Sequence, residues 1–344
     1  MARLYSPVRL VVAGIVLFAV AGILNYAPSG KYLFLPDRAR AVAPYVRVKG
    51  ERSDHDGGGI YYVAVEIRKA SVLERLFPRL HHGSTLVPES EVRAPGESES
   101  QHRRVELRAM AQSQEIAAAV ALRALGYHVD VRALGTTIAS VEPGSPAAAK
   151  LKPKDIVVGV DGRRAPSLLD LRRLIGKHEP GQSVELTIRR GKRIRQVPVK
   201  TIADPDHPRH PIIGVKTLTS CSIQKSGIRL PFPVHIDLGQ VGGPSAGLAF
   251  ALDLVEELGR DVDGGHKVAA TGELCVDGTV LPVGALKQKT IGAKRAGADV
   301  FLAPAGENTR DARRYAGRMR ILPVHSFRQA LHVLATLPKK RPKT

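Results

Sequence analysis

Ser245 stands between a glycine-rich stretch and a long apolar helical pattern, in "GGPSAGLAFALDLVEELG", Gly242 to Gly259. A hydroxyl at the start of a helix can cap that helix. It can also act as a nucleophile beside the backbone N–H groups that are free at a helix N-terminus. Because a serine attacks only after a neighbouring base has taken its proton, the catalytic role requires a base elsewhere in the chain.

Lys289 is a candidate for that base, 44 residues after Ser245 in a helical pattern that begins near Ala285 and stops at Gly297. A lysine accepts a proton only when it is neutral, so burial must lower its pKa from about 10.4 towards neutrality. Lys287 projects about 200° away around such a helix, so the two lysines cannot share a face. The neighbours that would exclude water from Lys289 are Leu286, Ile291 and Ala293.

The elements that must position these two residues are predicted from hydrophobic periodicity. "FPVHIDL" is typical of a strand, "GQVGG" of a tight loop, and the segment after Ser245 of a helix. A strand, an Asp277-Gly278 turn, a second strand, the Lys289 helix and the apolar strand "ADVFLAP" follow. Earlier in the chain we expect a strand at "GIYYVAVEIRKA", an exposed loop over Val87 to Arg104 and a helix that ends at Gly126.

The segment from Gly135 to Lys200 forms a separate compact pattern: a strand, the turn "EPGSP", the strand "DIVVGVDG", the helix "SLLDLRRLIG" and a hairpin about Arg190-Gly191. It resembles a bacterial PDZ domain; a small β-rich spacer is the alternative. PDZ domains bind extended peptides by adding a strand to a sheet edge. The resemblance implies a peptide along "TTIASV" with its carboxylate near Ala133, and the predicted peptide-binding residues are Leu134, Gly135, Thr136, Thr137 and Ile138.

"GGPSAG" and "GTVLPVGALKQKTIGAKRAGADVFLAP" resemble the proteolytic domain of the Lon family of serine–lysine peptidases. With an apolar N-terminus and a PDZ-like module, the chain most resembles the ATP-independent, membrane-anchored, PDZ-containing Lon-like proteases of bacteria. The resemblance implies Ser245 as nucleophile, Lys289 as general base and Thr271 as the residue that orients the lysine. His235 matches a histidine that we treat as structural. Gly242 replaces an acidic residue of the Lon pattern, and Gly242 with Gly243 lets the backbone approach the scissile carbonyl.

Two other functions fit parts of the sequence. Residues 243–247 satisfy the G-x-S-x-G pattern of α/β-hydrolases, which would require a histidine such as His325 or His332. The chain could also be a membrane-tethered PDZ adaptor with an inert protease-like domain. An ATPase motor is not encoded, because the sequence contains no G-x-x-x-x-G-K-[ST].

The N-terminal run "LVVAGIVLFAVAGIL" approaches the roughly 20 residues that a membrane span needs. We expect an uncleaved anchor, with a cleaved signal peptide as the alternative. Cys221 and Cys275 match no zinc or CxxC spacing and are expected to be plain buried thiols. The net charge of +20 does not identify a partner by itself, and with no tryptophan and 4% aromatic residues we do not expect nucleic-acid binding.

The sequence therefore predicts an α+β fold: a Lon-type serine–lysine protease domain with an embedded PDZ-like module and one N-terminal transmembrane helix. The resemblance implies a single-pass membrane protein, mostly extracytoplasmic, that acts on proteins or peptides as a homo-oligomeric ring without metal or cofactor. The predicted segments are a cytoplasmic N-terminus at 1–9, the anchor at 10–28, the first part of the protease domain at 45–127, the PDZ-like domain at 128–202, the proteolytic domain at 208–337 and a basic tail at 338–344.

Overall fold

The structure is a computed structural model. It describes residues 7–48, 58–93, 97–131, 135–166, 168–205, 207–217 and 227–340.

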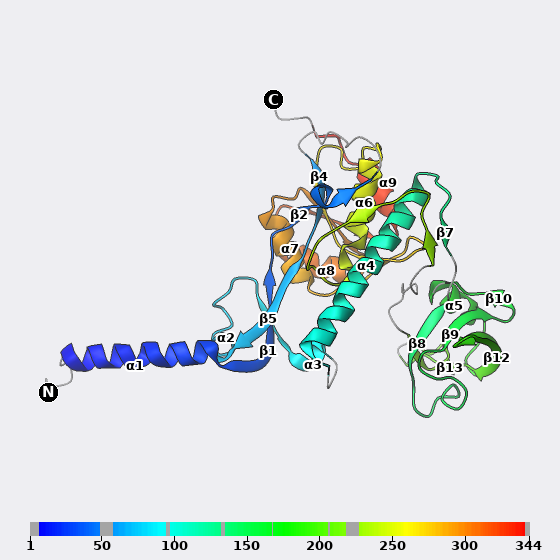
Figure 1. Ribbon diagram of the computed structural model, residues 1–344, viewed down its shortest axis with the longest axis horizontal. Coiled ribbons are helices and arrows are strands. Elements are labelled where there is room, and N and C mark those ends of the chain that lie inside the picture. Colours follow the sequence, from blue (N-terminus) through cyan, green and yellow to red (C-terminus); the bar gives the residue numbers. More distant parts are fainter. Residues whose placement is uncertain are drawn as a thin grey trace.

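The central sheet combines strands from the two ends of the chain (Figure 1). Its strand order is β2 (Arg40–Ala41), β4 (Gly59–Tyr62), β18 (Lys267–Ala270), β21 (Val300–Pro304) and β22 (Arg320–Val324). β4, β18, β21 and β22 are parallel, and only β2 runs antiparallel to its neighbour. β4 therefore lies inside a sheet whose next strand follows it by some two hundred residues.

Both faces of this sheet are covered by helices, because alternate residues of each strand point to opposite sides. On one face Val268 and Ala270 pack with helices α4 (Glu99–Ala124), α6 (Gly247–Glu257) and α9 (Phe327–Ala335). On the other face Ala269 packs with α7 (Leu286–Arg295) and α8 (Glu307–Tyr315). Figure 1 shows α4 running beside α6.

A second, antiparallel sheet has the order β5 (Val65–Ser71), β1 (Pro28–Pro36) and β6 (Thr85–Pro88). The short helices α2 (Val72–Leu76) and α3 (Glu89–Val92) flank it. The predicted strand at 59–70 is therefore two strands, β4 and β5, in different sheets.

The stretch from Val87 to Arg104 is exposed or half-buried in its described residues, as expected, but the expectation that it is a loop is wrong. β6, α3 and the first residues of α4 occupy the described part of this stretch. α4 begins with a capping box in which the Ser98 side chain accepts from Gln101 N and the Gln101 side chain accepts from Ser98 N. That S-x-x-Q pattern satisfies two N–H groups at the helix start and lengthens the helix beyond its apolar part.

The PDZ-like segment has a sheet and a hydrophobic core of its own (Figure 1). The strand order is β12 (Arg193–Lys200), β11 (Ser183–Arg190), β9 (Ile156–Val160), β8 (Thr136–Val141) and β15 (Val215–Thr217). β10 (Arg163–Arg164) pairs with β9, β13 (Ile202–Ala203) pairs with β14 (Pro211–Ile212), and helix α5 (Leu168–Ile175) packs on this core.

Short pairs and turns complete the described elements. They are η1 (Ala43–Tyr45), β3 (Val46–Arg47) with β17 (His235–Ile236), β7 (Asp130–Val131) with β16 (Ile228–Arg229), η2 (Pro244–Ala246), and β19 (Glu273–Leu274) with β20 (Val280–Leu281).

The N-terminal helix α1 (Pro7–Tyr26) extends away from the rest of the chain in Figure 1. Within the part of the chain that the structure describes, no helix combines the length and the apolar character required to cross a membrane. Most of the segment predicted as a cytoplasmic N-terminus, residues 1–6 of 1–9, lies outside the described residues.

One further expectation is corrected. Cys275 is buried as expected, but it is disulfide-bonded, not a plain thiol; Cys221, the other cysteine of the sequence, lies outside the described residues. In the basic tail, Lys339 is ion-paired with Asp261 and Lys340 with Asp299. The carbonyl oxygen of Gly264 also accepts a hydrogen bond from Lys340 N at 2.8 Å, so the described part of the tail is held to the domain.

Candidate functional site

Ser245 lies in the 3₁₀ turn η2, directly before helix α6. Gly243 precedes this turn with φ 86°, a left-handed conformation that strongly favours glycine. The residue at the N-cap of α6 is Ala246, and neither η2 nor α6 has a side-chain cap. The Ser245 side chain therefore caps neither helix, so the capping role considered from the sequence is wrong.

Helix α4 holds the backbone of the glycine loop, Gly242 to Pro244, by hydrogen bonds. Gly243 N donates to the carbonyl oxygen of Glu106 at 3.0 Å, and Ser113 Oγ donates to the carbonyl oxygen of Pro244 at 2.9 Å. A Cβ on Gly242 would lie 2.8 Å from Glu106 Cβ, so a side chain there would push the loop away from α4. Glu106 and Ser113 thus fix the backbone on both sides of the residue before Ser245.

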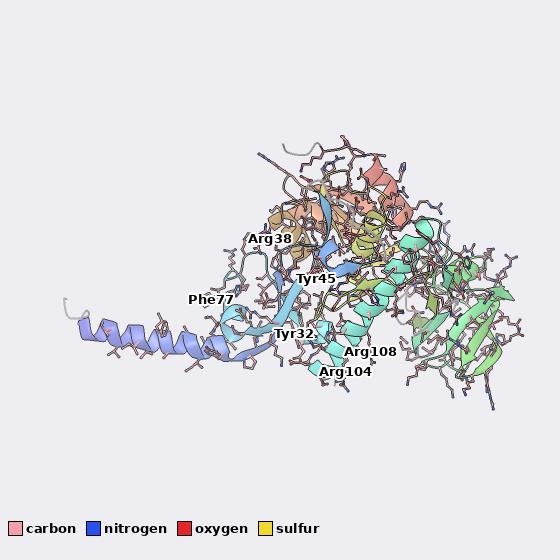
Figure 2. The ribbon with its side chains drawn as sticks, turned by 45° about the horizontal axis from the view of Figure 1, so that its top comes forward. Tyr32, Arg38, Tyr45, Phe77, Arg104 and Arg108 are labelled. Carbon is pink, nitrogen blue, oxygen red and sulfur yellow. The ribbon has the colours of Figure 1, made fainter. Side chains whose placement is uncertain are left out.

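Sequence reasoning missed this role of α4. The signal was present, since Glu106, Met110 and Ser113 recur at helical spacing on one face. The opposite face carries Arg104 and Arg108, which are exposed and marked in Figure 2. We call the face with Glu106, Met110 and Ser113 the α4 inner face. Nothing in the sequence shows which distant segment this face contacts.

Lys289 is buried on α7, with 5% of its surface exposed. Its Nζ donates to Thr271 Oγ1 at 3.3 Å, and Thr271 Oγ1 donates to the carbonyl oxygen of Ser245 at 3.1 Å. Thr271 therefore connects the lysine to the serine backbone. Burial lowers the pKa of Lys289 to about 7, because the charged ammonium is poorly solvated in this position.

The predicted surroundings of the lysine are also dry. Leu286, Ile291 and Ala293 are each at most 5% exposed. Lys287, on another face of the helix, donates from Nζ to the carbonyl oxygen of Ser84 at 2.8 Å. Among the hydrogen bonds of the described residues, none joins Ser245 Oγ directly to Lys289 Nζ.

Ser245 and Lys289 line the same cavity, which has a volume of about 1220 Å³. Its walls come from β1, β5, the α4 inner face, the loop before η2 and the start of α7. Tyr32, marked in Figure 2, contributes from β1.

The start of α6 adds an electrostatic feature to this cavity. A helix N-terminus carries a partial positive charge; at α6 the N–H groups of Gly247 and Leu248 already donate to the carbonyl oxygens of Pro244 and Gly272. Ser245 directly precedes that terminus, and Gly243, Pro244 and Ala246 line the cavity beside it. An oxygen that becomes negative near the Ser245 hydroxyl would be stabilised there.

The histidines on which an α/β-hydrolase would depend are not at this site. His325 and His332 are exposed and do not line the cavity, and neither does the exposed His235 of β17. His102 does line it, from α4, and lies 3.4 Å from a carboxylate oxygen of Glu97. The basic group that is buried beside Thr271 and Ser245 is a lysine.

The peptide-binding residues predicted on β8 are not at an open edge. β8 pairs with β9 through Thr136 and Thr137 on one side. On the other side it pairs with β15, where Ile138 faces Thr217 and Val141 faces Val215. Along Ile138 to Val141, the protein's own strand β15 therefore occupies the position that was predicted for a peptide. Leu134, with Ala133, lies outside the described residues, and Gly135 directly precedes β8.

Comparisons with known proteins match two segments of the chain. Residues 123–201 match the model of the PDZ domain, and residues 228–335 match the Lon protease (S16) C-terminal proteolytic domain. The C-terminal segment is therefore a proteolytic domain of a serine peptidase family. It contains Ser245, Thr271 and Lys289.

Several curated relatives match part of the chain. Lon protease 1 of Sorangium cellulosum is 47% identical over 75 residues, which is 21% of this chain and 9% of that protein. Lon protease 1 of Bacillus subtilis is 44% identical over 81 residues, 23% of this chain and 10% of that protein. Lon protease of Chloroflexus aggregans is 37% identical over 113 residues, 30% of this chain and 13% of that protein. The chain thus spans about a tenth of the length of these relatives.

A solved PDZ domain, that of an SdrC-like protein from Listeria monocytogenes, is 26% identical. It covers 26% of this chain and 92% of its own, with a TM-score of 0.24.

Proposed function

We propose that the chain is a serine endopeptidase in which Ser245 is the nucleophile and Lys289 is the general base. One observation carries the proposal: a lysine buried to 5% exposure lines the same cavity as Ser245, and Thr271 connects the two. A neutral amine in this position accepts the hydroxyl proton as Ser245 Oγ attacks the scissile carbonyl. The protonated lysine then donates that proton to the leaving amine, and water hydrolyses the acyl-enzyme.

The test uses the full chain and a fluorogenic peptide library. Ser245→Ala and Lys289→Ala should each abolish hydrolysis without a loss of folded structure. Lys289→Arg should also be inactive, because a guanidinium stays protonated and cannot act as a base. Lys287→Ala is the matched control on the same helix and should keep its activity. Turnover that survives in Lys289→Arg, or disappears on replacement of His325 or His332, would contradict the dyad.

We propose that hydrolysis needs no ATP, since the sequence lacks a phosphate-binding loop of the G-x-x-x-x-G-K-[ST] type. Hydrolysis should proceed at the same rate in buffer treated with apyrase.

A wild-type protein inactive on every peptide in every oligomeric state would favour the alternative, an adaptor with an inert protease domain. A ring assembly that encloses the cavity is part of the proposal, and an active monomer in ultracentrifugation would contradict it.

We propose that the PDZ domain holds a peptide at the β15 edge of its sheet, because β15 covers the side of β8 where the resemblance implied a peptide. Among the described strands, β15 is paired only with β8, and peptide binding by strand addition needs such an unpaired edge. The test is isothermal titration with peptides selected from a library. Val215→Pro should weaken binding by disrupting β15, whereas Arg193→Pro on the opposite edge strand β12 should not.

We also propose a membrane location with most of the chain outside the cytoplasm. The support is that α1 exposes apolar side chains around its surface, among them Val11, Ile15, Phe18 and Ile23. A disulfide at Cys275 fits an oxidising compartment. Carbonate-resistant membrane attachment that is lost when residues 1–27 are removed would support the anchor. A reporter at the C-terminus that is active only in the cytoplasm would contradict the orientation.

A further inference from the structure

Five carboxylates gather at the end of α6 farthest from Ser245. Glu256 and Glu257 follow Asp253 by three and four residues along the helix, so each is a neighbour of Asp253 on the helix surface. The loop after the helix contributes Asp261 and Asp263. Four of the five side chains are buried, with exposures from 1% to 7%; only Asp261 reaches solvent.

The loop holds three of these carboxylates in a compact group. One oxygen from each of Glu256, Asp261 and Asp263 lies within 4.8 Å of the others. Glu256 Oε2 accepts from Val262 N at 2.7 Å and from Asp263 N at 3.0 Å, which fixes the loop to the helix. Asp261 Oδ1 accepts from Gly264 N at 2.8 Å. The three carboxylates are therefore preorganised around one point.

Asp253 is an independent indication of a missing positive charge. It is 1% exposed, and neither of its carboxylate oxygens has a hydrogen-bond partner. Glu256, one of the three grouped carboxylates, is its neighbour one helical turn later on α6. A buried carboxylate without a hydrogen bond or counter-charge costs several kcal/mol, and a bound cation removes that cost.

We propose that Glu256, Asp261 and Asp263 bind a calcium ion, with Asp253 contributing negative charge behind them. The ligand set is all oxygen, without histidine or cysteine, which selects a hard cation over zinc or copper. The three oxygens lie within 4.8 Å of one another, close enough for one ion to contact all three at a Ca–O distance of about 2.4 Å. Ca²⁺ also accepts irregular coordination more readily than Mg²⁺. Entry is through Asp261, whose side chain is 50% exposed.

In the structure, Lys339 is paired with one of the three proposed calcium ligands, Asp261. Its Nζ donates to Asp261 Oδ2 at 2.7 Å, and it supplies the positive charge that a calcium ion would supply. Calcium binding would displace this ion pair and fasten the loop to the end of the same helix that presents Ser245. The site is distant from the proposed dyad along α6, so the proposal does not depend on catalysis.

The experiment is isothermal titration of CaCl₂ into the chelator-treated full chain, with the melting temperature measured in parallel, in a Ser245→Ala background that prevents self-cleavage. Wild type should bind one ion and melt at a higher temperature in calcium. Asp261→Asn should weaken binding by about tenfold or more. Lys339→Ala should bind calcium at least as tightly as wild type. Asp311→Asn is the matched control, since Asp311 is 51% exposed and ion-paired with Arg314 in the same way.

Three outcomes would overturn the proposal. They are no heat and no change in melting temperature with calcium, equal affinity in Asp261→Asn and wild type, and a response to Mg²⁺ without one to Ca²⁺. Asp263→Asn tests a buried ligand, and its failure to fold would leave the exposed Asp261→Asn as the deciding variant.

Discussion

Lys289→Met tests whether the buried amine is neutral in the folded protein. Burial lowers the pKa of Lys289 from 10.5 to about 7. Between these values the unfolded chain holds the proton and the folded chain does not. Because the unfolded state binds more protons in this window, the free energy of unfolding must rise with pH. A methionine of similar volume removes the titration and keeps the packing.

The magnitude follows from about 1.36 kcal/mol for each unit of pKa shift. Integrated over the two titrations, the free energy of unfolding of the lysine protein should gain about 2 kcal/mol between about pH 7.5 and 9 relative to Lys289→Met. At about pH 7.5 the methionine variant should be the more stable by up to about 4 kcal/mol. The lysine is thus retained at a cost to stability, as expected for a group that has a chemical task.

The assay is urea denaturation at several pH values, in a Ser245→Ala background so that cleavage does not interfere. Lys294→Met, on the exposed side of the same helix, is the control and should follow the pH dependence of its parent. The reasoning is refuted if Lys289→Met and its parent show the same dependence on pH. In the active protein, hydrolysis should correspondingly rise with pH through about 7, as Lys289 loses its proton.

Three further changes have defined outcomes. Gly292→Ala places a Cβ against the carbonyl oxygen of Asp37, so α7 must shift. We expect hydrolysis to be lost and the free energy of unfolding to fall by about 2 kcal/mol or more. Gly284→Ala, with open space around it, is the control and should be tolerated. Cys275→Ser should lower the free energy of unfolding by about 2–4 kcal/mol, and a reductant should reduce wild type to the same value. Ser113→Ala removes the bond to Pro244 and should reduce kcat several-fold at a stability cost of about 1 kcal/mol, measured by kinetics and urea denaturation; an unchanged kcat would mean that the loop does not need α4.

The sequence indicated the pieces of the site that are close to one another along the chain. The glycine loop, Ser245 and the helix after it form one local pattern, and Lys289 follows from a second amphipathic helix with small and apolar neighbours. Thr271 came from the family resemblance, and the structure places its hydroxyl between Lys289 and the Ser245 carbonyl. Whether these residues catalyse hydrolysis is for the variants above to decide.

The contributions that were missed all depend on contacts between distant segments. Glu106 and Ser113 reach the loop before Ser245 from more than a hundred residues away, and no local pattern reports such a contact. β15 covers β8 after an excursion through the whole PDZ-like segment, so the open edge of that sheet could not be identified from periodicity. The disulfide at Cys275 was missed because spacing alone does not distinguish a bonded cysteine from a buried thiol.

The position of β4 inside the central sheet has a consequence for the order in which the protein is built. Tyr62 pairs with Ala270, so the chain must close a loop of some two hundred residues before this pair of strands can form. Contacts of such high contact order form late in folding. A clipped chain that has both Ser245 and Lys289 but lacks β4 and α4 exposes the edge of β18 and the apolar side of α6. β4 and α4 are synthesised first, but β4 pairs with β18 and α4 contacts the serine loop only after the C-terminal segments have been made, so the site is completed only when both ends of the chain have assembled.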